Sequence, residues 1–212
     1  MLTRNVFASL LAGAVLVAVA AGPAVAGGGS RTHDGFFLRM SAGLGRANAD
    51  ISDNSGSLEI SGTAGDLNLA VGGMVGPNFA LHGTLWGWSM SDPDGDLTVT
   101  GVGSGSGTLN GTLTMGAIGV GATYYFMPAN VFASYSVGMG SLKGDGEDLE
   151  GKTKSGIAFD VTVGKEWWVG DAWGLGLNGG VAYFNAEDDT ILGISESWTG
   201  PSYAVRFSAT FN

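Results

Sequence analysis

The strongest constraint on this chain comes from residues 202–211, where apolar and small polar side chains alternate without a break. One face carries Tyr203, Val205, Phe207, Ala209 and Phe211, and the other carries Ser202, Ala204, Arg206, Ser208 and Thr210. Successive side chains point to opposite faces of an extended chain, so the pattern predicts a β-strand with one apolar face. Its length also matches the roughly 9–11 residues with which a tilted strand crosses a bilayer.

Seven earlier segments repeat this alternation, which predicts seven more strands at residues 36–45, 65–75, 79–88, 111–126, 131–140, 157–166 and 173–183. Gly, Pro, Asn and Asp mark tight turns at 76–78, 127–130 and 170–171. Longer polar connections are expected at 46–64, 89–110, 141–155 and 186–201. Because short turns and long loops alternate strictly, we expect an all-β fold, an eight-stranded antiparallel barrel.

Two details of this pattern concern residues 79–110. Whether Trp86 and Trp88 face inward or outward is left open, because a bulge near Gly87 would turn both rings outward. The connection 89–110 retains strand-like residues on both sides of a Gly-Ser tip, so it is interpreted as a hairpin that continues beyond the barrel.

Alternation does not say which face points inward, and composition decides this. A soluble barrel of the lipocalin type would place the apolar face inside and the polar face in water. Charged residues make up only 13% of the chain, against about 25% in ordinary soluble domains. The polar face is mostly Gly, Ser, Ala, Thr and Asn, which makes a poor soluble surface but fits a tight interior. We therefore expect a transmembrane barrel with its apolar face toward lipid.

Composition also excludes several classes of site and partner. The chain has no cysteine, so disulfides and thiolate zinc sites are excluded. A formal charge of −10 argues against a nucleic-acid partner. No cofactor is expected.

The first residues have the pattern of a secretory signal peptide. Arg4 precedes an apolar run at 6–21, and Ala24-Val25-Ala26 supplies small residues for cleavage. The expected organisation is a signal peptide at 1–26, a short lead at 27–34 and a barrel domain at 35–212.

The closing strand ends in an aromatic residue, Phe211, one position before Asn212. With the alternating strands, this end resembles the small bacterial outer-membrane barrels of the OmpX, OmpA-transmembrane-domain and OmpW type. The resemblance covers about residues 35–212 and rests on architecture. It implies short periplasmic turns, long extracellular loops and a place in the cell outer membrane. It also implies contact with lipid and lipopolysaccharide, and recognition of the last strand by the barrel-assembly machinery.

Aromatic residues gather where the tight turns are expected, as an interfacial girdle would at the periplasmic rim. The predicted girdle consists of Phe79, Tyr124, Tyr125, Phe126, Trp167, Trp168, Trp173 and Phe211.

Six ionisable side chains fall on the inward face: Arg39, Asp66, His82, Asp160, Glu166 and Arg206. Unpaired charges in a narrow interior are costly, so these groups are expected to pair. The hypothesis is that Glu166 or Asp160 holds Arg39 and Arg206, so that a charge network plugs the lumen. The alternative is a narrow pore in which such pairs change partners.

Catalysis and metal binding have weak support. The histidines are His33, before the barrel, and His82, which has no matching nucleophile motif, so no enzyme is expected. Asp92, Asp94 and Asp96 resemble the start of a calcium loop, but Gly103 stands where the last acidic ligand is needed.

The function expected is therefore a structural or surface-interaction role, adhesion-like, with any surface partner bound through residues 89–110. The alternative is an OmpW-like conduit for small hydrophobic solutes.

Overall fold

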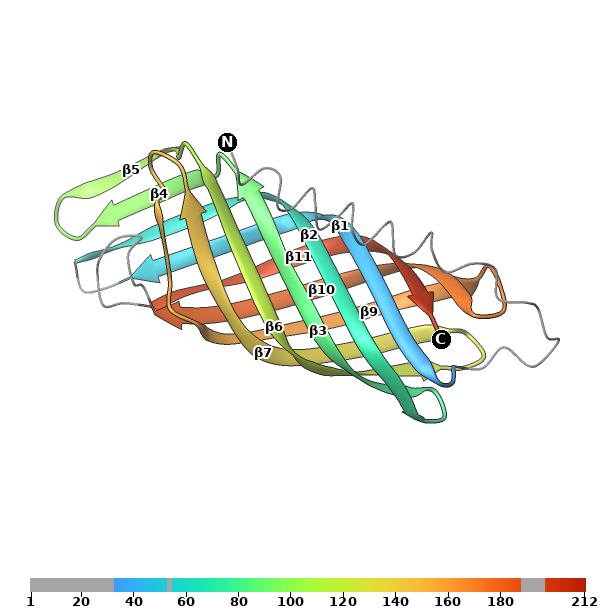
Figure 1. Ribbon diagram of the computed structural model, residues 1–212. Coiled ribbons are helices and arrows are strands. Elements are labelled where there is room, and N and C mark those ends of the chain that lie inside the picture. Colours follow the sequence, from blue (N-terminus) through green and yellow to red (C-terminus); the bar gives the residue numbers. More distant parts are fainter. Residues whose placement is uncertain (1–32, 53–54, 188–196) are drawn as a thin grey trace.

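The computed structural model describes residues 33–52, 55–187 and 197–212 (Figure 1). The predicted signal peptide at 1–26 lies outside these residues. The strands are β1 (Phe36–Ser52), β2 (Gly56–Gly76), β3 (Phe79–Ser91), β4 (Asp94–Val99), β5 (Gly103–Thr108), β6 (Thr112–Phe126), β7 (Val131–Asp145), β8 (Gly151–Lys152), β9 (Gly156–Trp168), β10 (Trp173–Glu187) and β11 (Ser197–Phe211). Within the described ranges, no helix is long and apolar enough to span a membrane.

Eight of these strands close into a ring in the order β1-β11-β10-β9-β7-β6-β3-β2, and β2 pairs with β1 again. Every pairing is antiparallel. The closing strand is in register with the first, with Leu38 opposite Phe211 and Leu44 opposite Val205. The prediction of an eight-stranded antiparallel barrel is confirmed.

The barrel has a turn end and a loop end. The turn end holds the tight connections β2–β3, β6–β7 and β9–β10, together with the start of β1 and the end of β11. Asn78 and Asn130 adopt positive φ angles of 60° and 51° in two of these turns. Asn tolerates this left-handed conformation better than most residues, which explains its place there.

The predicted loop at 46–64 is wrong. β1 continues to Ser52 and β2 begins at Gly56, with an unbroken register from Ala47 opposite Gly62 to Ser52 opposite Ser57. Ala47, Ala49 and Ile51 give this stretch an inward apolar face, so it extends the hairpin instead of leaving it. The predicted loop at 186–201 is shortened as well, since β10 reaches Glu187 and β11 begins at Ser197. Residues 188–196 lie outside the described part.

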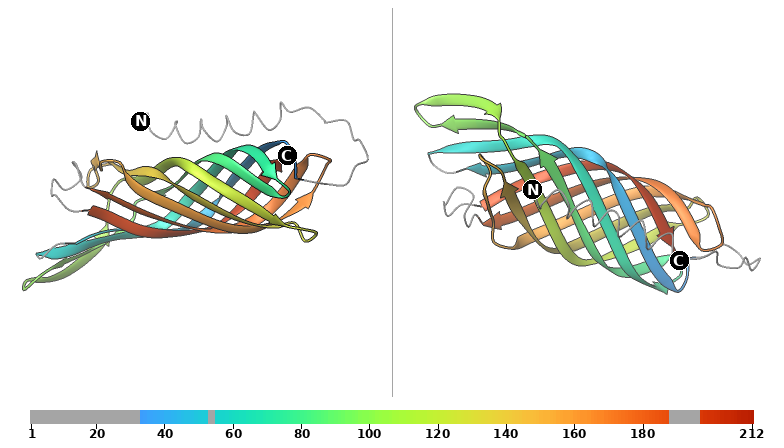
Figure 2. Two further views of the ribbon diagram at one scale, coloured as in Figure 1. Left: turned by 90° about the horizontal axis from the view of Figure 1, so that it is seen from below. Right: turned by 45° about the horizontal axis from the view of Figure 1, so that its top comes forward.

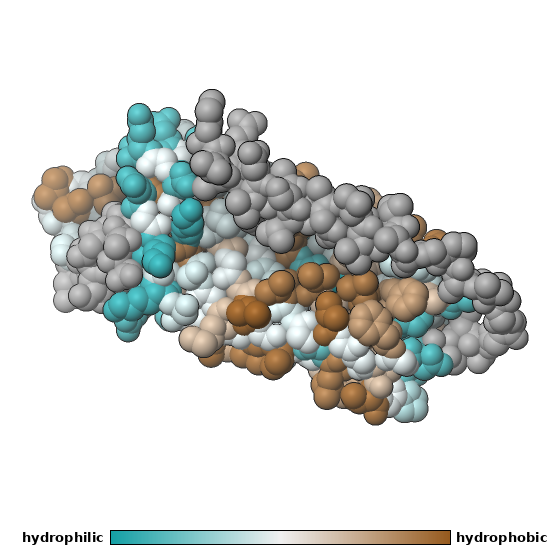
Figure 3. Space-filling view, in the orientation of Figure 1, coloured by the Kyte–Doolittle hydropathy of each residue, from teal (hydrophilic) through white to brown (hydrophobic). Residues whose placement is uncertain are grey.

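The direction of the alternation inverts toward the loop end. Near the turn end, outward side chains are apolar, and Leu44 and Phe207 are 69% and 74% exposed. Beyond them, the outward residues of β1 are Arg46, Asn48 and Asp50. The interior there becomes apolar instead, in a cluster that includes Ile51, Ile60, Trp86, Trp88, Met90, Leu113, Met115, Leu142, Phe184 and Trp198. Figure 3 shows the apolar surface over the middle of the barrel and hydrophilic residues toward the loop end.

Trp86 and Trp88 both point inward, at 4% and 1% exposure, so the open question about their face is settled. The register of β2 with β3 is continuous through Gly87. Its irregularity lies at the turn end, between Met74 and Gly76.

The connection 89–110 forms the predicted hairpin, β4–β5. It does not stand alone, because β4 also pairs with the extended end of β2, from Ser61 opposite Asp94 to Gly56 opposite Val99. The extended ends of β1 and β2 and the strands β4 and β5 thus form a sheet that projects beyond the barrel (Figure 2). We call it the projecting sheet; β5 is its edge.

Candidate functional site

Arg206 occupies the middle of the lumen and is 1% exposed. Its Nε and Nη2 donate to the two carboxylate oxygens of Asp66 on β2, the second at 3.1 Å. Nη2 also donates to Asp160 Oδ2 on β9 at 3.0 Å, and Nη1 donates to Thr162 Oγ1 at 3.0 Å. One guanidinium on β11 therefore joins carboxylates from strands on either side of it.

Asp160 completes this centre. Its Oδ1 accepts hydrogen bonds from Thr162 Oγ1 at 2.9 Å and from Asn68 Nδ2 at 3.2 Å. Asn68 lies on β2, so the contact crosses the lumen. Buried charges are tolerated when they are paired and their remaining hydrogen-bonding capacity is used, and Asp160 meets both conditions.

A glycine makes room for the guanidinium. A Cβ atom on Gly180 of β10 would lie 2.5 Å from Arg206 Nη1 and 2.8 Å from Cζ. The neighbouring Gly179 points the other way, where the nearest atom to such a Cβ, Ala204 O, is 4.0 Å away. A side chain at 180 would therefore displace the guanidinium, which its bonds to Asp66 and Asp160 hold in place.

Aromatic side chains enclose the centre on its loop side. Trp88 is the cross-strand neighbour of Asp66, and its ring lies 6.2 Å from that of Phe184. Trp86, Trp88 and Phe184 are all at most 4% exposed. Water therefore has little access to the ion pairs from this side.

A second polar group lies nearer the turn end, around Thr123. Thr123 Oγ1 accepts from Arg39 Nη2 at 3.3 Å, contacts His82 Nε2 at 3.0 Å, and donates to Ser134 Oγ at 2.9 Å. His82 Nδ1 lies 2.7 Å from Thr84 Oγ1, so hydroxyls engage both ring nitrogens. The Arg39 guanidinium also lies over the Phe132 ring, 4.3 Å from its centroid.

Glu166 departs from the hypothesis that it holds an arginine. Its Oε1 accepts hydrogen bonds from Thr210 Oγ1 at 2.6 Å and Tyr125 Oη at 3.3 Å. Within the described ranges, neither Arg39 nor Arg206 forms an ion pair with Glu166; the lumen ion pairs join Arg206 to Asp66 and Asp160. All six predicted lumen groups are at most 5% exposed, but they divide into separate hydrogen-bonded groups.

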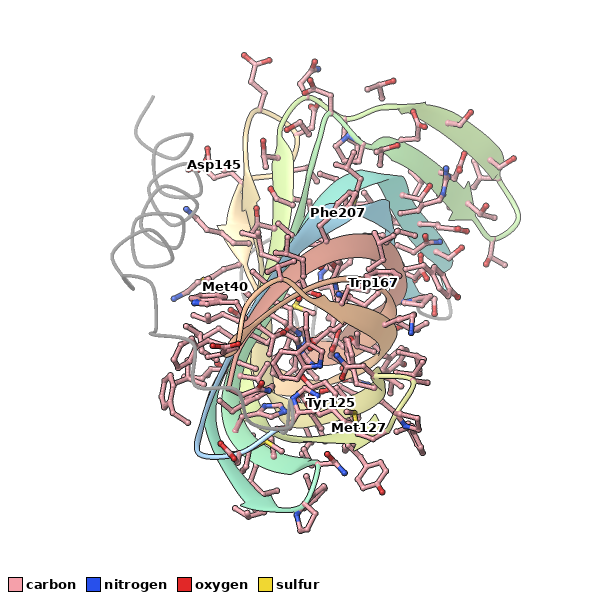
Figure 4. The ribbon with its side chains drawn as sticks, turned by 90° about the vertical axis from the view of Figure 1, so that its right-hand side faces the viewer. Met40, Tyr125, Met127, Asp145, Trp167 and Phe207 are labelled. Atoms are coloured by element: carbon pink, nitrogen blue, oxygen red, sulfur yellow. The ribbon has the colours of Figure 1, made fainter. Side chains whose placement is uncertain are left out.

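The aromatic residues of the predicted girdle divide between outside and inside. Tyr124, Phe126 and Trp167 are exposed, and Phe79, Trp173 and Phe211 lie on the outward parity of their strands. Tyr125 is fully buried and faces the lumen, and Trp168 turns toward the turn-end mouth, 4.9 Å from the His33 ring. Adjacent residues of a strand point to opposite faces, and the neighbours of Tyr125 and Trp168 point outward. These two residues therefore do not belong to an outer girdle. Figure 4 looks from the turn end, with Tyr125 and Trp167 labelled.

The three aspartates of the possible calcium loop do not converge. Asp92 Oδ1 accepts from the backbone N–H of Gly111 at 3.2 Å. Asp94 and Asp96 are exposed on one face of β4. Asp92 thus serves the connection between β3 and β6.

Two features of the interior are not predicted from the sequence. The apolar cluster at the loop end was missed because its strand extensions carry the polar outward residues of a loop. His33 was given no role, yet it is 3% exposed at the turn-end mouth. The alternation of Ala47, Ala49 and Ile51 was a usable signal for the first feature; nothing in the sequence pointed to the second.

No protein-family model matches the chain, and neither does any curated protein sequence. Solved structures with a similar fold include the outer membrane protein OprG from Pseudomonas aeruginosa, with 12% identity and a TM-score of 0.48 over 86% of this chain and 99% of that chain. Neisserial surface protein A matches with 12% identity and a TM-score of 0.48, over 83% and 96%. The outer membrane protein AlkL matches with 14% identity and a TM-score of 0.46, over 90% and 95%. At these values the similarity carries no inference about what this chain binds or does.

Replacing Asp160 with Asn should destabilise the barrel more than replacing Glu166 with Gln. The new amide group would place N–H donors against Arg206, Thr162 or Asn68, at a cost of about 1.5–3 kcal/mol for a hydrogen bond to a charged group. Gln at 166 still accepts from two neutral hydroxyls, so its cost should stay under about 1 kcal/mol. Urea unfolding of both variants in lipid vesicles measures the difference, and the reverse ranking would contradict the assigned pairing.

Replacing Gly180 with Ala should cost about 1–3 kcal/mol, because the added methyl group overpacks the Arg206 guanidinium. Gly179→Ala is the matched control, since it adds the same methyl group on the outward side. Equal unfolding midpoints for the two variants would show that the space at Gly180 is not needed.

Proposed function

We propose that this chain is an integral protein of the bacterial outer membrane, with a closed lumen and a surface-interaction role carried by the projecting sheet. Inversion of the alternation is the observation that supports the membrane location. A surface that is apolar toward the turn end and polar toward the loop end suits a chain that passes from lipid into water. Between Phe36 and Leu44 the outward face of β1 is apolar over nine residues (36 to 44), within the length of a spanning strand.

The proposed orientation places the turn end in the periplasm and the loop end at the cell surface. Outward aromatic residues at the turn end support it, because such rings favour the membrane–water interface. Trp173 packs against Phe211 with centroids 5.3 Å apart, and Phe36 lies 6.3 Å from Phe211. These residues are well placed to anchor the seam between β1 and β11 in the inner leaflet of this membrane.

A closed lumen is supported by the burial of its charged centre. Arg206, Asp66 and Asp160 are at most 5% exposed and linked to one another. An eight-stranded interior is just wide enough for side chains to fill. His82 has hydroxyls on both ring nitrogens and is 5% exposed, so no substrate reaches it, and we propose no enzymatic activity.

The surface role is supported by the free edge of β5. This strand pairs only with β4 among the described strands, and its six residues, GSGSGT, are all exposed. Natural sheets usually protect such an edge with lysine, proline or a bulge, because unpaired N–H and C=O groups bind other strands. β5 has no lysine or proline, and its register with β4 is unbroken. We propose that an extended segment of another protein adds to this edge.

The two faces of the projecting sheet indicate which residue types a partner strand would need. One face presents Leu97 and Val99, with exposures of 50% and 37%, and Val102 in the β4–β5 turn is 84% exposed. The other face carries a row of carboxylates on three neighbouring strands, with Asp50 opposite Glu59 and Glu59 opposite Asp96. Burial, and then the charge of Glu59, raises the pKa of Asp50. Like charges directly opposite one another repel, so a segment with alternating apolar and basic residues would complement both faces.

A second candidate is a conduit for small hydrophobic solutes, favoured by the apolar interior at the loop end. Among the described residues, the indole Nε1–H groups of Trp86 and Trp88 have no hydrogen-bond partner, so an entering molecule with an acceptor oxygen could bind them. The polar Arg206 centre stands between this region and the turn end, which makes passage through the barrel the weaker proposal.

The folded barrel should migrate differently on a detergent gel before and after boiling, and should give no steady ion conductance in a planar bilayer. The first outcome follows from a closed ring of backbone hydrogen bonds, and the second from the filled lumen. Recovery in a soluble fraction would contradict the membrane location. Steady conductance, or uptake of hydrophobic solutes by vesicles that contain the protein, would favour the conduit.

Lysines on the β5 edge should weaken binding of a synthetic peptide of alternating Val and Lys by about tenfold, or about 1.4 kcal/mol. The variant is Ser104→Lys with Ser106→Lys, which places charged side chains on the edge strand. The control is Ser57→Lys with Thr98→Lys, which adds equal charge to the same face on the inner strands β2 and β4. Fluorescence anisotropy of the labelled peptide measures both affinities. Equal loss in the two variants would indicate general repulsion and contradict strand addition.

A further inference from the structure

His33 precedes the first strand, yet its side chain lies inside the turn-end mouth of the barrel. Its ring stacks on Tyr125, with centroids 3.6 Å apart and planes inclined by 16°. Trp168 contacts the ring at 4.9 Å and 35°. A histidine on a short polar lead would ordinarily be solvated, so this burial needs specific partners.

Both ring nitrogens have such partners, and they come from distant parts of the chain. His33 Nε2 lies 2.6 Å from Asn130 Oδ1 in the β6–β7 turn. Asn212 Nδ2, on the last residue of the sequence, lies 2.7 Å from His33 Nδ1. Asn130 also donates through Nδ2 to the backbone carbonyl of Glu166 at 3.3 Å, which fixes the orientation of its amide. Nε2 is therefore the protonated nitrogen, and Nδ1 accepts from Asn212.

The position of His33 relative to the lumen decides what these contacts do. Tyr125 covers Glu166, to which its hydroxyl donates at 3.3 Å, and packs against Phe132 at 5.7 Å. Phe37, Tyr125 and Phe132 are fully buried and form an aromatic floor on the side of the lumen lined by β1, β6 and β7. His33 lies on the outer side of this floor and ties it to the chain end and to a turn.

We infer that His33 is a stopper: its ring fills a socket formed by Tyr125, Trp168, Asn130 and Asn212, and so closes the turn-end mouth beside the aromatic floor. Withdrawal of this ring would leave the mouth open on the side that the aromatic floor does not cover, and so open the polar part of the lumen between the mouth and Arg206 to the periplasm. This inference rests on the proposed closed lumen and adds to it a removable periplasmic closure. A ring held by two hydrogen bonds and stacking contacts can leave as one unit, unlike the Arg206 centre, whose groups belong to the strands.

The chain has no cysteine, so a single introduced thiol can report access to the lumen. Ser208 suits this purpose, because it is buried between Ser41 and Gly176 and its hydroxyl has no hydrogen-bond partner among the described residues. In detergent micelles, a cationic methanethiosulfonate should reach Cys at 208 only from the turn end, since apolar side chains fill the loop end. Mass spectrometry then gives the labelling rate.

Ser208→Cys should react slowly with His33 in place, and about tenfold or more faster with His33→Ala, because two hydrogen bonds and a stacking contact are lost. Asn212→Ala removes one hydrogen bond, so its acceleration should be smaller. Ser91→Cys, exposed at the loop end, is the control and should react equally fast with either residue at 33.

Folding is checked for each variant by the gel shift of unboiled samples. A folded His33→Ala variant whose rate stays within about twofold, less than loss of one hydrogen bond would give, overturns the stopper. If both His33→Ala and Asn212→Ala prevent folding, His33 fastens the chain ends and is not removable, which also overturns it. If Ser208→Cys already reacts as fast as Ser91→Cys with His33 in place, the closed lumen of the proposed function fails instead.

Discussion

A guanidinium in the middle of a narrow barrel is the interaction on which the interior depends. Arg206 on β11 reaches Asp66 on β2 and Asp160 on β9, so it fastens the closing strand to the walls on both sides of the seam. A buried charge that loses its partner is strongly destabilising, so the neighbouring residues are constrained in turn. Gly180 leaves space for the guanidinium, and Trp88 and Phe184 keep water from the ion pairs. The residues at these three positions are therefore constrained by the burial of Arg206.

The strands join two kinds of barrel end to end. Toward the turn end, the exterior is apolar and the interior is polar; toward the loop end this is reversed, with Arg46 and Asn48 outside and Ala47 and Ile51 inside. The second arrangement is that of a soluble barrel, which is stable in water because its apolar side chains are buried inside. A strand that changes from one arrangement to the other needs no break in its register. It needs only that the apolar residues move from the outward-facing set of side chains to the inward-facing set.

This construction explains what the sequence could and could not reveal. Parity is a local property, so the inward position of all six ionisable groups was predictable. The pair of Arg206 with Asp160 was among those expected. The other partners were not predictable, because contacts across the lumen depend on the stagger of the strands, which brings Glu166 to Tyr125 and Thr210 instead of an arginine. The extension of β1 was mistaken for a loop because its outward residues are polar, as those of a loop are. His33 could not be placed at all, since a single residue before a strand has no periodicity.

The join between the two barrel types affects how well the edge strand β5 is held in place as a binding site. Ordering a flexible segment costs free energy on binding, and a partner gains affinity when the segment is already held in its bound conformation. The β1–β2 ladder runs without interruption from the turn end to Ser52 opposite Ser57, and β4 continues it sideways to β5. The free edge is thus attached to a ladder rooted in the closed barrel, with Ile51 and Ile60 packed inside the loop end. In the proposed closed lumen, the same filled interior would make the barrel a rigid support for that edge.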